Sequence, residues 1–256
     1  MAKAKGIHTH KYLGLGKAPV KHDDRNLRFA AIFKTPAKLP KEYDFDLQHP
    51  DVPTPMFGND AYGDCVIAGR AHQTLRFEDL EQGALIPITD KEVITEYLKE
   101  SGGQDSGLVV LDSLNSWRKK GWRAAKRIYK IKAFAQINHN DPNEVKSAVF
   151  MDLGVGFGLS LPLSAKTQTQ SGKIWDVVKG SGSKPNSWGG HYTYVSGYTT
   201  KGPVCVTWGR KQPMTWSFVK KYCDEAYAII DAKDTPKKKI NLKSKEIDKF
   251  LRSLRR

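Results

Sequence analysis

The sequence predicts an α+β protein with two lobes and a cleft between them. Up to about residue 125 the apolar residues recur at helical spacing, and beyond it they alternate as in strands. Helices and strands that are segregated along the chain in this way are typical of α+β domains, and clefts between lobes commonly hold binding sites. The chain of 256 residues is long enough for one large domain or two small ones, and it shows no internal repeat.

Three helices are predicted in the first half. One begins near Cys65, where small residues allow close packing, and its apolar pattern continues to Leu80. A second opens at Thr89-Asp90 and ends at Gly102-Gly103, because Thr is a good N-cap and paired glycines end helices. The third covers residues 108–120.

Strands dominate the predicted second half, with one short helix among them. Alternating or continuous apolar runs bounded by turn residues indicate each strand. The helix is expected over residues 143–151, directly after Pro142. The strands are expected over residues 128–137, 155–163, 192–198, 204–208 and 226–230.

Composition divides the chain into three parts. Residues 1–38 are rich in glycine and proline between basic residues and predict an extended arm. Residues 39–232 form the folded domain, with a helical half of about 39–125 and a β half of about 126–232. The remainder, 233–256, is a basic tail in which Ile247, Phe250, Leu251 and Leu254 fall on one helical stripe. This short amphipathic helix either docks on the domain or binds a partner.

The net charge of +15 lies mostly at the two ends of the chain. Residues 1–49 carry +5 and residues 233–256 carry +7, whereas residues 50–232 carry only +3. Clustered basic charge predicts an anionic partner for residues 1–38 and 233–256, such as nucleic acid, an acidic protein or a membrane surface. The alternative is a pair of solvated segments that keep the protein soluble.

The small number of cysteines and the lack of a visible targeting signal predict a reducing, cytoplasmic setting. Neither a signal peptide nor an apolar run of membrane-spanning length is visible. Three cysteines (Cys65, Cys205 and Cys223) are too few for a disulfide framework or a four-thiolate zinc site. Histidines and cysteines do not fall at ligand spacings, so we expect neither a metal nor a cofactor.

Two segments carry residues suited to nucleophilic chemistry. Cys65 follows a glycine-bearing loop and begins a helix, where backbone amides and the helix dipole favour a thiolate. A small core residue is the competing interpretation, since most unpaired cysteines are that. His191 follows Gly189-Gly190 and leads into a strand, from which it could take the thiol proton and return it to a leaving group.

Together these segments resemble the papain-like cysteine peptidases over roughly residues 39–230. Asn59 stands six residues before Cys65, where the family has a glutamine, and Pro55 stands four before Asn59. His191 is followed by Gly197-Tyr198, as in the family's histidine strand. Further similarities are Leu39-Pro40 with Asp46 near the opening of the domain, Gly102-Gly103 followed by Gly107 as a substrate-edge loop, and Trp208-Gly209.

The resemblance implies a role for each matching position. Cys65 would be the nucleophile and His191 the general base and acid. The Asn59 amide and the Cys65 backbone N–H would form the oxyanion hole. Gly102, Gly103 and Gly190 would line the substrate site, and Trp208 would shield His191 from water.

The sequence departs from the family's pattern at several positions. The asparagine that orients the histidine is absent, and its place falls on Val206 or Thr207 depending on the direction of counting. Of these two, Thr207 could offer a hydroxyl to the imidazole. Asp64 precedes the nucleophile as a reasonable N-cap, but a negative charge there would oppose thiolate formation.

Three functions follow as hypotheses. The first is a papain-like peptidase that hydrolyses peptide amides with a Cys65–His191 dyad. The second is a catalytically inactive papain-like scaffold that works as a structural or binding protein through its basic ends. Because reduced papain-like proteins also occur in bacteria and phages, such a protein could be virion-associated. The third is nucleic-acid binding through the two ends of the chain.

Overall fold

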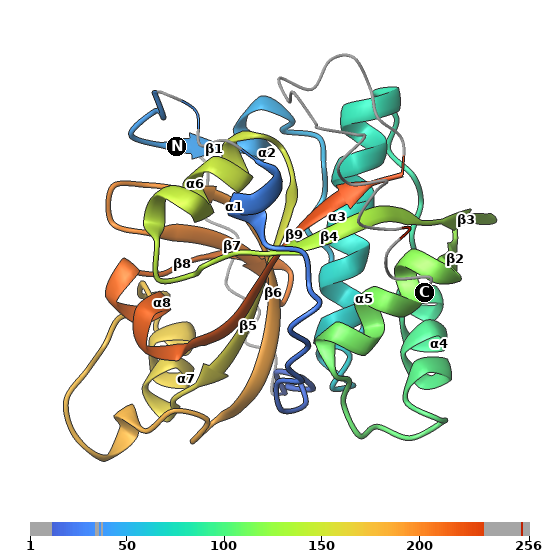
Figure 1. The fold of residues 1–256 in the computed structure, drawn as a ribbon. Helices are drawn as coiled ribbons and strands as arrows, with labels where there is room; N and C mark the ends of the chain where they lie inside the picture. Colours follow the sequence, from blue (N-terminus) through green and yellow to red (C-terminus); the bar gives the residue numbers. More distant parts are fainter. Residues whose placement is uncertain (1–11, 34–35, 37, 233–251, 253–256) are drawn as a thin grey trace, which may run out of the picture.

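The computed structural model describes residues 12–33, 36, 38–232 and 252 and confirms the α+β prediction. Three helices, α3 (Cys65–Gln82), α4 (Asp90–Glu100) and α5 (Val110–Lys119), lie on one side of the molecule, and an antiparallel sheet forms the other (Figure 1). All three helices begin within two residues of the positions that the sequence predicts. Helix α3 is the longest and packs against the middle of the sheet.

Local sequence explains where these helices start and stop. Thr89 caps α4 in a capping box, in which Glu92 reaches back to the Thr89 N–H. Gly83 ends α3 with a φ of 60°, a left-handed conformation that glycine adopts without steric cost. Helix α3 is buried along nearly its whole length, which identifies it as the core helix between the two lobes.

The main sheet has seven strands, and every neighbouring pair in it is antiparallel. Its order is β4-β9-β5-β6-β7-β8, and the short β1 pairs with β6. The strands are β1 (Tyr43–Asp44), β4 (Ile131–Gln136), β5 (Gly154–Leu161), β6 (Gly189–Tyr198), β7 (Pro203–Thr207), β8 (Arg210–Pro213) and β9 (Cys223–Asp231).

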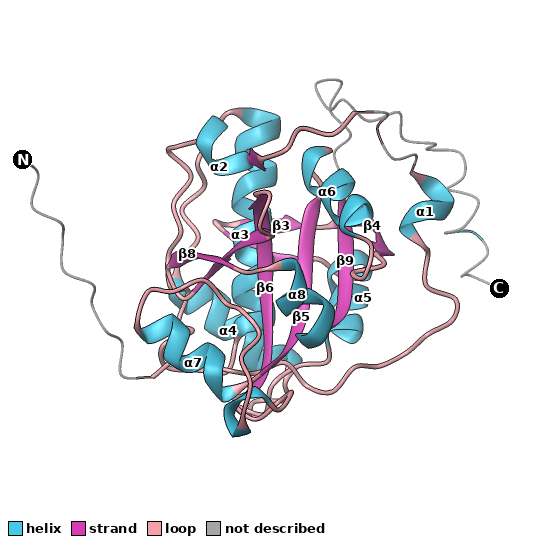
Figure 2. Ribbon diagram, turned by 90° about the vertical axis from the view of Figure 1, so that its left-hand side faces the viewer, coloured by secondary structure: helices cyan, strands magenta, loops and turns pink. Residues whose placement is uncertain are grey.

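The alternation of side chains along the strands builds a separate core on each face of the sheet. On β9, Ala226, Ala228 and Ile230 join one cluster, whereas Tyr227 and Ile229 join the other. The first cluster lies under α6 (Pro142–Phe150) and α8 (Trp216–Tyr222), and the second lies against α3 (Figure 2).

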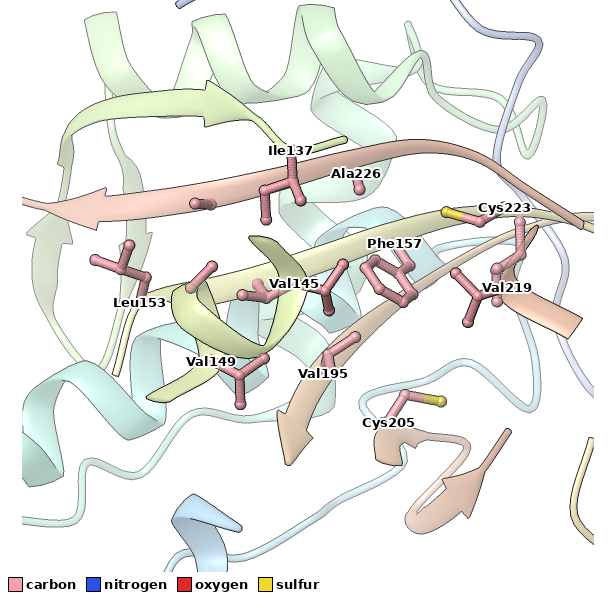
Figure 3. Packing of buried hydrophobic residues seen from close by; sticks show 14 of the residues in the cluster. Ile137, Val145, Val149, Leu153, Phe157, Val195, Cys205, Val219, Cys223 and Ala226 are labelled. Carbon is pink, nitrogen blue, oxygen red and sulfur yellow. The ribbon is translucent and has the colours of Figure 1, made fainter. Parts of the chain in front are cut away.

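Figure 3 shows the first cluster from close by. Val145 and Val149 of α6 and Val219 of α8 point toward Phe157 and Val195 on the sheet. On β5 the bulky residues face this cluster, and the alternate positions on the other face are Gly154, Gly156, Gly158 and Ser160. Three of these four positions have no side chain, which leaves room there for groups from elsewhere in the chain.

Several short elements differ from the sequence prediction. The strand predicted over residues 128–137 is two strands, because β2 (Trp122–Ala124) and β3 (Arg127–Tyr129) form a hairpin before β4 begins. Its turn places Ala125 and Lys126 at positive φ without the Asn or Gly that normally signals such a turn. The elements that were not predicted are α1 (Phe29–Ile32), α2 (Phe45–Gln48), α7 (Leu163–Gln170), α8, β1, β8 and the 3-10 turn Ser181–Ser183.

Part of the predicted basic arm packs on the domain. Leu27, Phe29, Ile32 and Phe33 are buried in the first cluster. The amphipathic stripe of the tail, Ile247 to Leu254, lies outside the described residues. None of the described helices is long and apolar enough to cross a membrane.

Candidate active site

Cys65 lies at the first residue of α3, where the helix meets the sheet. Its side chain is buried, and its Sγ accepts a hydrogen bond of 3.4 Å from the backbone N–H of Tyr192 on β6. Tyr192 directly follows His191, so the helix and the strand bring Cys65 and His191 close together. Residues that are 126 positions apart in the chain thus share one buried site.

His191 is held in place on two sides by residues at the end of β7. Its Nε2 lies 2.6 Å from the Thr207 Oγ1, and its ring stacks on Trp208 with centroids 4.2 Å apart and planes inclined by 15°. The other ring nitrogen, Nδ1, is buried without a hydrogen-bond partner among the described residues. The tautomer with hydrogen on Nε2 donates to Thr207 and leaves Nδ1 free to accept a proton.

Of the two residues that fall at the position of the missing asparagine, Thr207 is the one at the imidazole. Val206 pairs with Tyr194 in the sheet and is buried in the strand. Successive strand residues point to opposite faces, so only one of the two can face His191. The structure therefore brings the Thr207 hydroxyl to the ring nitrogen.

Asn59 lies in the loop before α3 and is buried. Its Nδ2 donates 3.1 Å to the Tyr62 carbonyl, which fixes the side-chain amide against the loop. An amide nitrogen carries two hydrogens, and the Asn59 side chain also hydrogen-bonds the neighbouring Asp64 carboxyl. The backbone carbonyl of Asn59 accepts from the N–H of Gly14 at 2.7 Å.

Asp64 differs from its predicted behaviour in two ways. It stands at the N-cap of α3, but its side chain makes no capping hydrogen bond, so the predicted side-chain cap is wrong. Burial raises the pKa of Asp64 to about 8, although the neighbouring Asn59 side chain opposes the rise. The carboxyl is therefore mostly neutral at pH 7, and the negative charge that would oppose a Cys65 thiolate is largely absent.

A segment near the start of the chain, residues 13–18, lies across this site. Gly14 donates to Asn59 and its carbonyl accepts from the Trp208 indole N–H at 3.2 Å. The backbone N–H of Lys17 donates to the Gly190 carbonyl at 3.1 Å, so the segment also contacts β6. Figure 1 shows this segment, in dark blue, running between the sheet and the helices.

The opposite edge of the segment pairs with the loop before α5. Leu108 donates to the Gly16 carbonyl at 2.8 Å and accepts from the Ala18 N–H at 2.9 Å. These bonds form a parallel bridge between Lys17 and Leu108. We name residues 13–18 the covering segment, because the Gly16 backbone contacts the Cys65 thiol and the segment also contacts Gly189 and Gly190, next to His191.

Burial beneath the covering segment sets the protonation of both groups. Burial raises the pKa of Cys65 to about 12, although hydrogen bonds from Tyr192 and Gly16 oppose the rise. Burial also lowers the pKa of His191 to about 3. In the covered state both side chains are therefore neutral at pH 7, and the nucleophile is a thiol.

The three glycines that were predicted to line the substrate site do not lie together. Gly190 contacts the covering segment through its carbonyl. Gly102 and Gly103 instead form an exposed turn after α4, and a methyl group built on either would meet nothing within 4 Å. The loop residues that touch the segment are Gly107 and Leu108, a few positions farther along.

Sequence reasoning missed Leu108 and the covering segment itself. The segment did carry one signal, the alternation Gly14-Leu15-Gly16, which is typical of a chain that passes very close to another backbone. A methyl group on Gly16 would lie 1.5 Å from the Gly63 carbonyl oxygen.

No family model and no curated protein matches the chain. Solved structures do match it. Xylellain, a cysteine protease from Xylella fastidiosa, superposes with a TM-score of 0.66 at 16% identity, over 90% of this chain and 100% of that one. The fold is that of the papain-like cysteine proteases.

Two further solved structures of cysteine proteases are also similar to this chain. A procathepsin B from Trypanosoma congolense matches with a TM-score of 0.58 at 12% identity, covering 88% of each chain. A cysteine protease from Carica candamarcensis matches with a TM-score of 0.56 at 12% identity, over 76% of this chain and 100% of that one. The predicted papain-like architecture, with its long helix beginning at Cys65, is thereby confirmed.

Proposed function

We propose that this protein is a papain-like cysteine peptidase that hydrolyses peptide amides with Cys65 and His191. The observation that carries the proposal is the placement of Cys65 at the start of α3, close to a histidine whose buried Nδ1 has no hydrogen-bond partner in the described part of the chain. A buried imidazole nitrogen without a partner is costly unless it has a task, and accepting a thiol proton is such a task.

The reaction begins when the covering segment leaves the cleft. Water and substrate then reach Cys65, so the desolvation that keeps it a thiol is reduced. The Sγ proton passes to His191 Nδ1, while Nε2–H donates to the Thr207 hydroxyl and holds the ring in position. The thiolate attacks the carbonyl carbon of the substrate, and the carbonyl oxygen becomes an oxyanion.

The remaining steps use groups around the same helix end. The Cys65 backbone N–H and the Asn59 side-chain amide receive the oxyanion, and one such donor contributes about 3 kcal/mol of transition-state stabilisation. His191 returns its proton to the leaving amine, and the amide C–N bond breaks to leave a thioester. Water, deprotonated by His191, then hydrolyses the thioester and regenerates the thiol.

The covered form is the resting state in this proposal. The carbonyls and N–H groups that would align a substrate are those now bonded to residues 14–18, such as Leu108 and Gly190. Displacement or removal of the covering segment is therefore required for turnover.

The second candidate is a papain-like binding protein without turnover. The neutral, buried state of Cys65 and the absence of the orienting asparagine favour it. In this case residues 1–38 and 233–256 would hold an anionic partner (nucleic acid, an acidic protein or a membrane surface), including attachment to a virion. Most of the tail's charge lies outside the described residues.

Hydrolysis of a fluorogenic peptide library tests the peptidase directly. The chain is assayed as it is and as Gly16→Ala, which crowds the covering segment out of the cleft. Cys65→Ala should abolish hydrolysis with little loss of stability, whereas Cys205→Ala, a buried cysteine outside the site, should retain it. Hydrolysis that persists in Cys65→Ala contradicts the assignment of the nucleophile, and hydrolysis that is absent even from Gly16→Ala contradicts the peptidase and favours the binding protein.

A further inference from the structure

One side chain of the covering segment enters a pocket of its own beside the nucleophile. The Lys17 side chain is only 2% exposed, and its Nζ lies 3.1 Å from Asp224 Oδ2 and 3.5 Å from Glu225 Oε1. The same ammonium donates to the Ala18 carbonyl at 3.3 Å. A basic side chain is rarely buried so deeply unless the site is built to receive it.

The pocket belongs to the sheet lobe and is shaped for a long side chain. Asp224 and Glu225 lie at the start of β9, and Gly158 on the neighbouring β5 pairs with Glu225. A methyl group on Gly158 would lie 2.5 Å from Lys17 Cε and 2.4 Å from Glu225 Cγ, so only glycine leaves the space. Ser160 Oγ donates to Asp224 Oδ2 at 2.7 Å and fixes that carboxylate.

The position of the pocket relative to Cys65 and His191 indicates on which side of the scissile bond it lies. Gly16, the residue before Lys17, lies at Cys65 and donates its backbone N–H toward the thiol. Gly14 lies at Trp208, next to the histidine that would protonate a leaving amine. Lys17 therefore occupies the opposite, acyl side of the cleft, along Leu108.

We propose that this pocket, formed by Asp224, Glu225 and Gly158, selects a lysine or arginine side chain on the acyl side of the substrate's scissile bond, and that Lys17 occupies it in the resting protein. The inference rests on the proposed peptidase function and names its substrate class: peptides with a basic residue close before the cleaved bond.

The preference for a cation follows from desolvation. When Lys17 leaves, two carboxylates remain in a pocket where Glu225 is only 1% exposed. Burial raises the pKa of Glu225 to about 7 even with Lys17 opposing the rise, so the ionised pair is costly without a counter-charge. A leucine or methionine side chain would bury Glu225 without a counter-charge, whereas an ammonium or guanidinium group would pair with it and with Asp224.

The test compares peptides that differ only in the basic residue. Lysine, arginine, methionine and leucine are placed in turn at the first, second and third residue before the cleaved bond, and hydrolysis by full-length Gly16→Ala is measured. We expect Lys or Arg at one of these positions to raise kcat/KM about tenfold or more over Met. The Asp224→Asn and Glu225→Gln double variant, made with Lys17→Met so that no buried ammonium loses its partners, should remove this preference.

Asp112→Asn is the matched control. Asp112 also binds a lysine of the N-terminal part of the chain, Lys21, at 2.7 Å, but both side chains are 56% exposed. Its loss should leave the preference for basic residues unchanged.

A second readout does not need turnover. Acetylated Leu-Gly-Lys-amide and Leu-Gly-Met-amide are compared for their ability to slow alkylation of Cys65 in Gly16→Ala. Stronger protection by the lysine peptide, lost in the Asp224→Asn and Glu225→Gln background, supports the pocket.

The two proposals fail in different ways. Hydrolysis without a preference for basic residues overturns the pocket and keeps the peptidase. Selective protection by the lysine peptide without any hydrolysis overturns the peptidase and keeps a cation-selective cleft. Neither hydrolysis nor selective protection overturns both.

Discussion

Replacing Gly16 with alanine should open the candidate active site. The added methyl carbon would lie 1.5 Å from the Gly63 carbonyl oxygen and 2.3 Å from the Gly63 carbonyl carbon, both of them backbone atoms that cannot rotate away. Non-bonded contacts this short do not occur, so the covering segment must move away from α3.

The size of the effect follows from the hydrogen bonds that the movement breaks. Leu108 N–H to Gly16, Ala18 N–H to Leu108 and Lys17 N–H to Gly190 all depend on the present position of the segment. A net contribution of about 1 kcal/mol each amounts to about 3 kcal/mol, or roughly a hundredfold increase in the uncovered population. Cys65, now a buried thiol, becomes accessible in that population.

Alkylation with iodoacetamide at pH 7, followed by mass spectrometry at each cysteine, measures the change. We expect Cys65 to react about a hundredfold faster in Gly16→Ala than in the parent chain, whereas the buried Cys205 stays protected and reports an intact fold. Gly182→Ala is the control, because a methyl there meets its nearest atom at an ordinary 3.7 Å. An unchanged Cys65 rate with Cys205 still protected would refute the assignment of residues 13–18 as the barrier.

The other predictions concern protonation, orientation and the ion pairs behind the site. Because burial lowers the pKa of His191 to about 3 from its ordinary value of 6.5, the unfolded chain binds the extra proton between these values and stability falls as pH falls through that window. The His191 share of this loss should reach about 2 kcal/mol by pH 5 in chemical denaturation, on top of the share of His72, whose pKa burial also lowers, and a His191→Gln variant that loses as much as the parent chain would contradict the assignment. Thr207→Val in the Gly16→Ala chain should slow Cys65 alkylation below pH 7 about tenfold, because the hydroxyl at His191 Nε2 is lost. Thr207→Ser keeps this hydroxyl and should retain the alkylation rate. Equal rates in the two variants would exclude an orienting hydroxyl. Asp46→Asn should destabilise the fold by about 3 kcal/mol, because Asp46 binds Arg76 through two hydrogen bonds of 2.8 Å and the buried Arg76 charge would lose its carboxylate partner. A change below about 1 kcal/mol in urea unfolding would show that the ion pair adds little to stability.

Local patterns were sufficient to predict the main elements and the chemistry of the site residues. Thr89 and the glycines after α4 carry their own start and stop signals, and a cysteine at a helix start needs no distant contact to be noticed. The order of Asn59, Cys65, His191 and Trp208 along the chain was enough to predict the papain-like fold, which the superpositions confirm. Short elements such as α8 and the β2–β3 hairpin escaped prediction. Although Thr215 caps α8, the helix has only seven residues and depends on packing, and the hairpin turn has positive φ at Ala125 and Lys126, which give no turn signal.

Electrostatic state and occupancy of the cleft depend on the tertiary structure. Whether Asp64 carries a charge beside Cys65 depends on burial, which arises only when the lobes close around it. The choice of Thr207 over Val206 depends on which face of β7 meets His191. Lys17 and Asp224 lie 207 residues apart, and no local pattern connects them. The sequence determined which reactive groups the protein has, and the folded chain decided which of them meet, because desolvation and ion pairing are properties of neighbours in space.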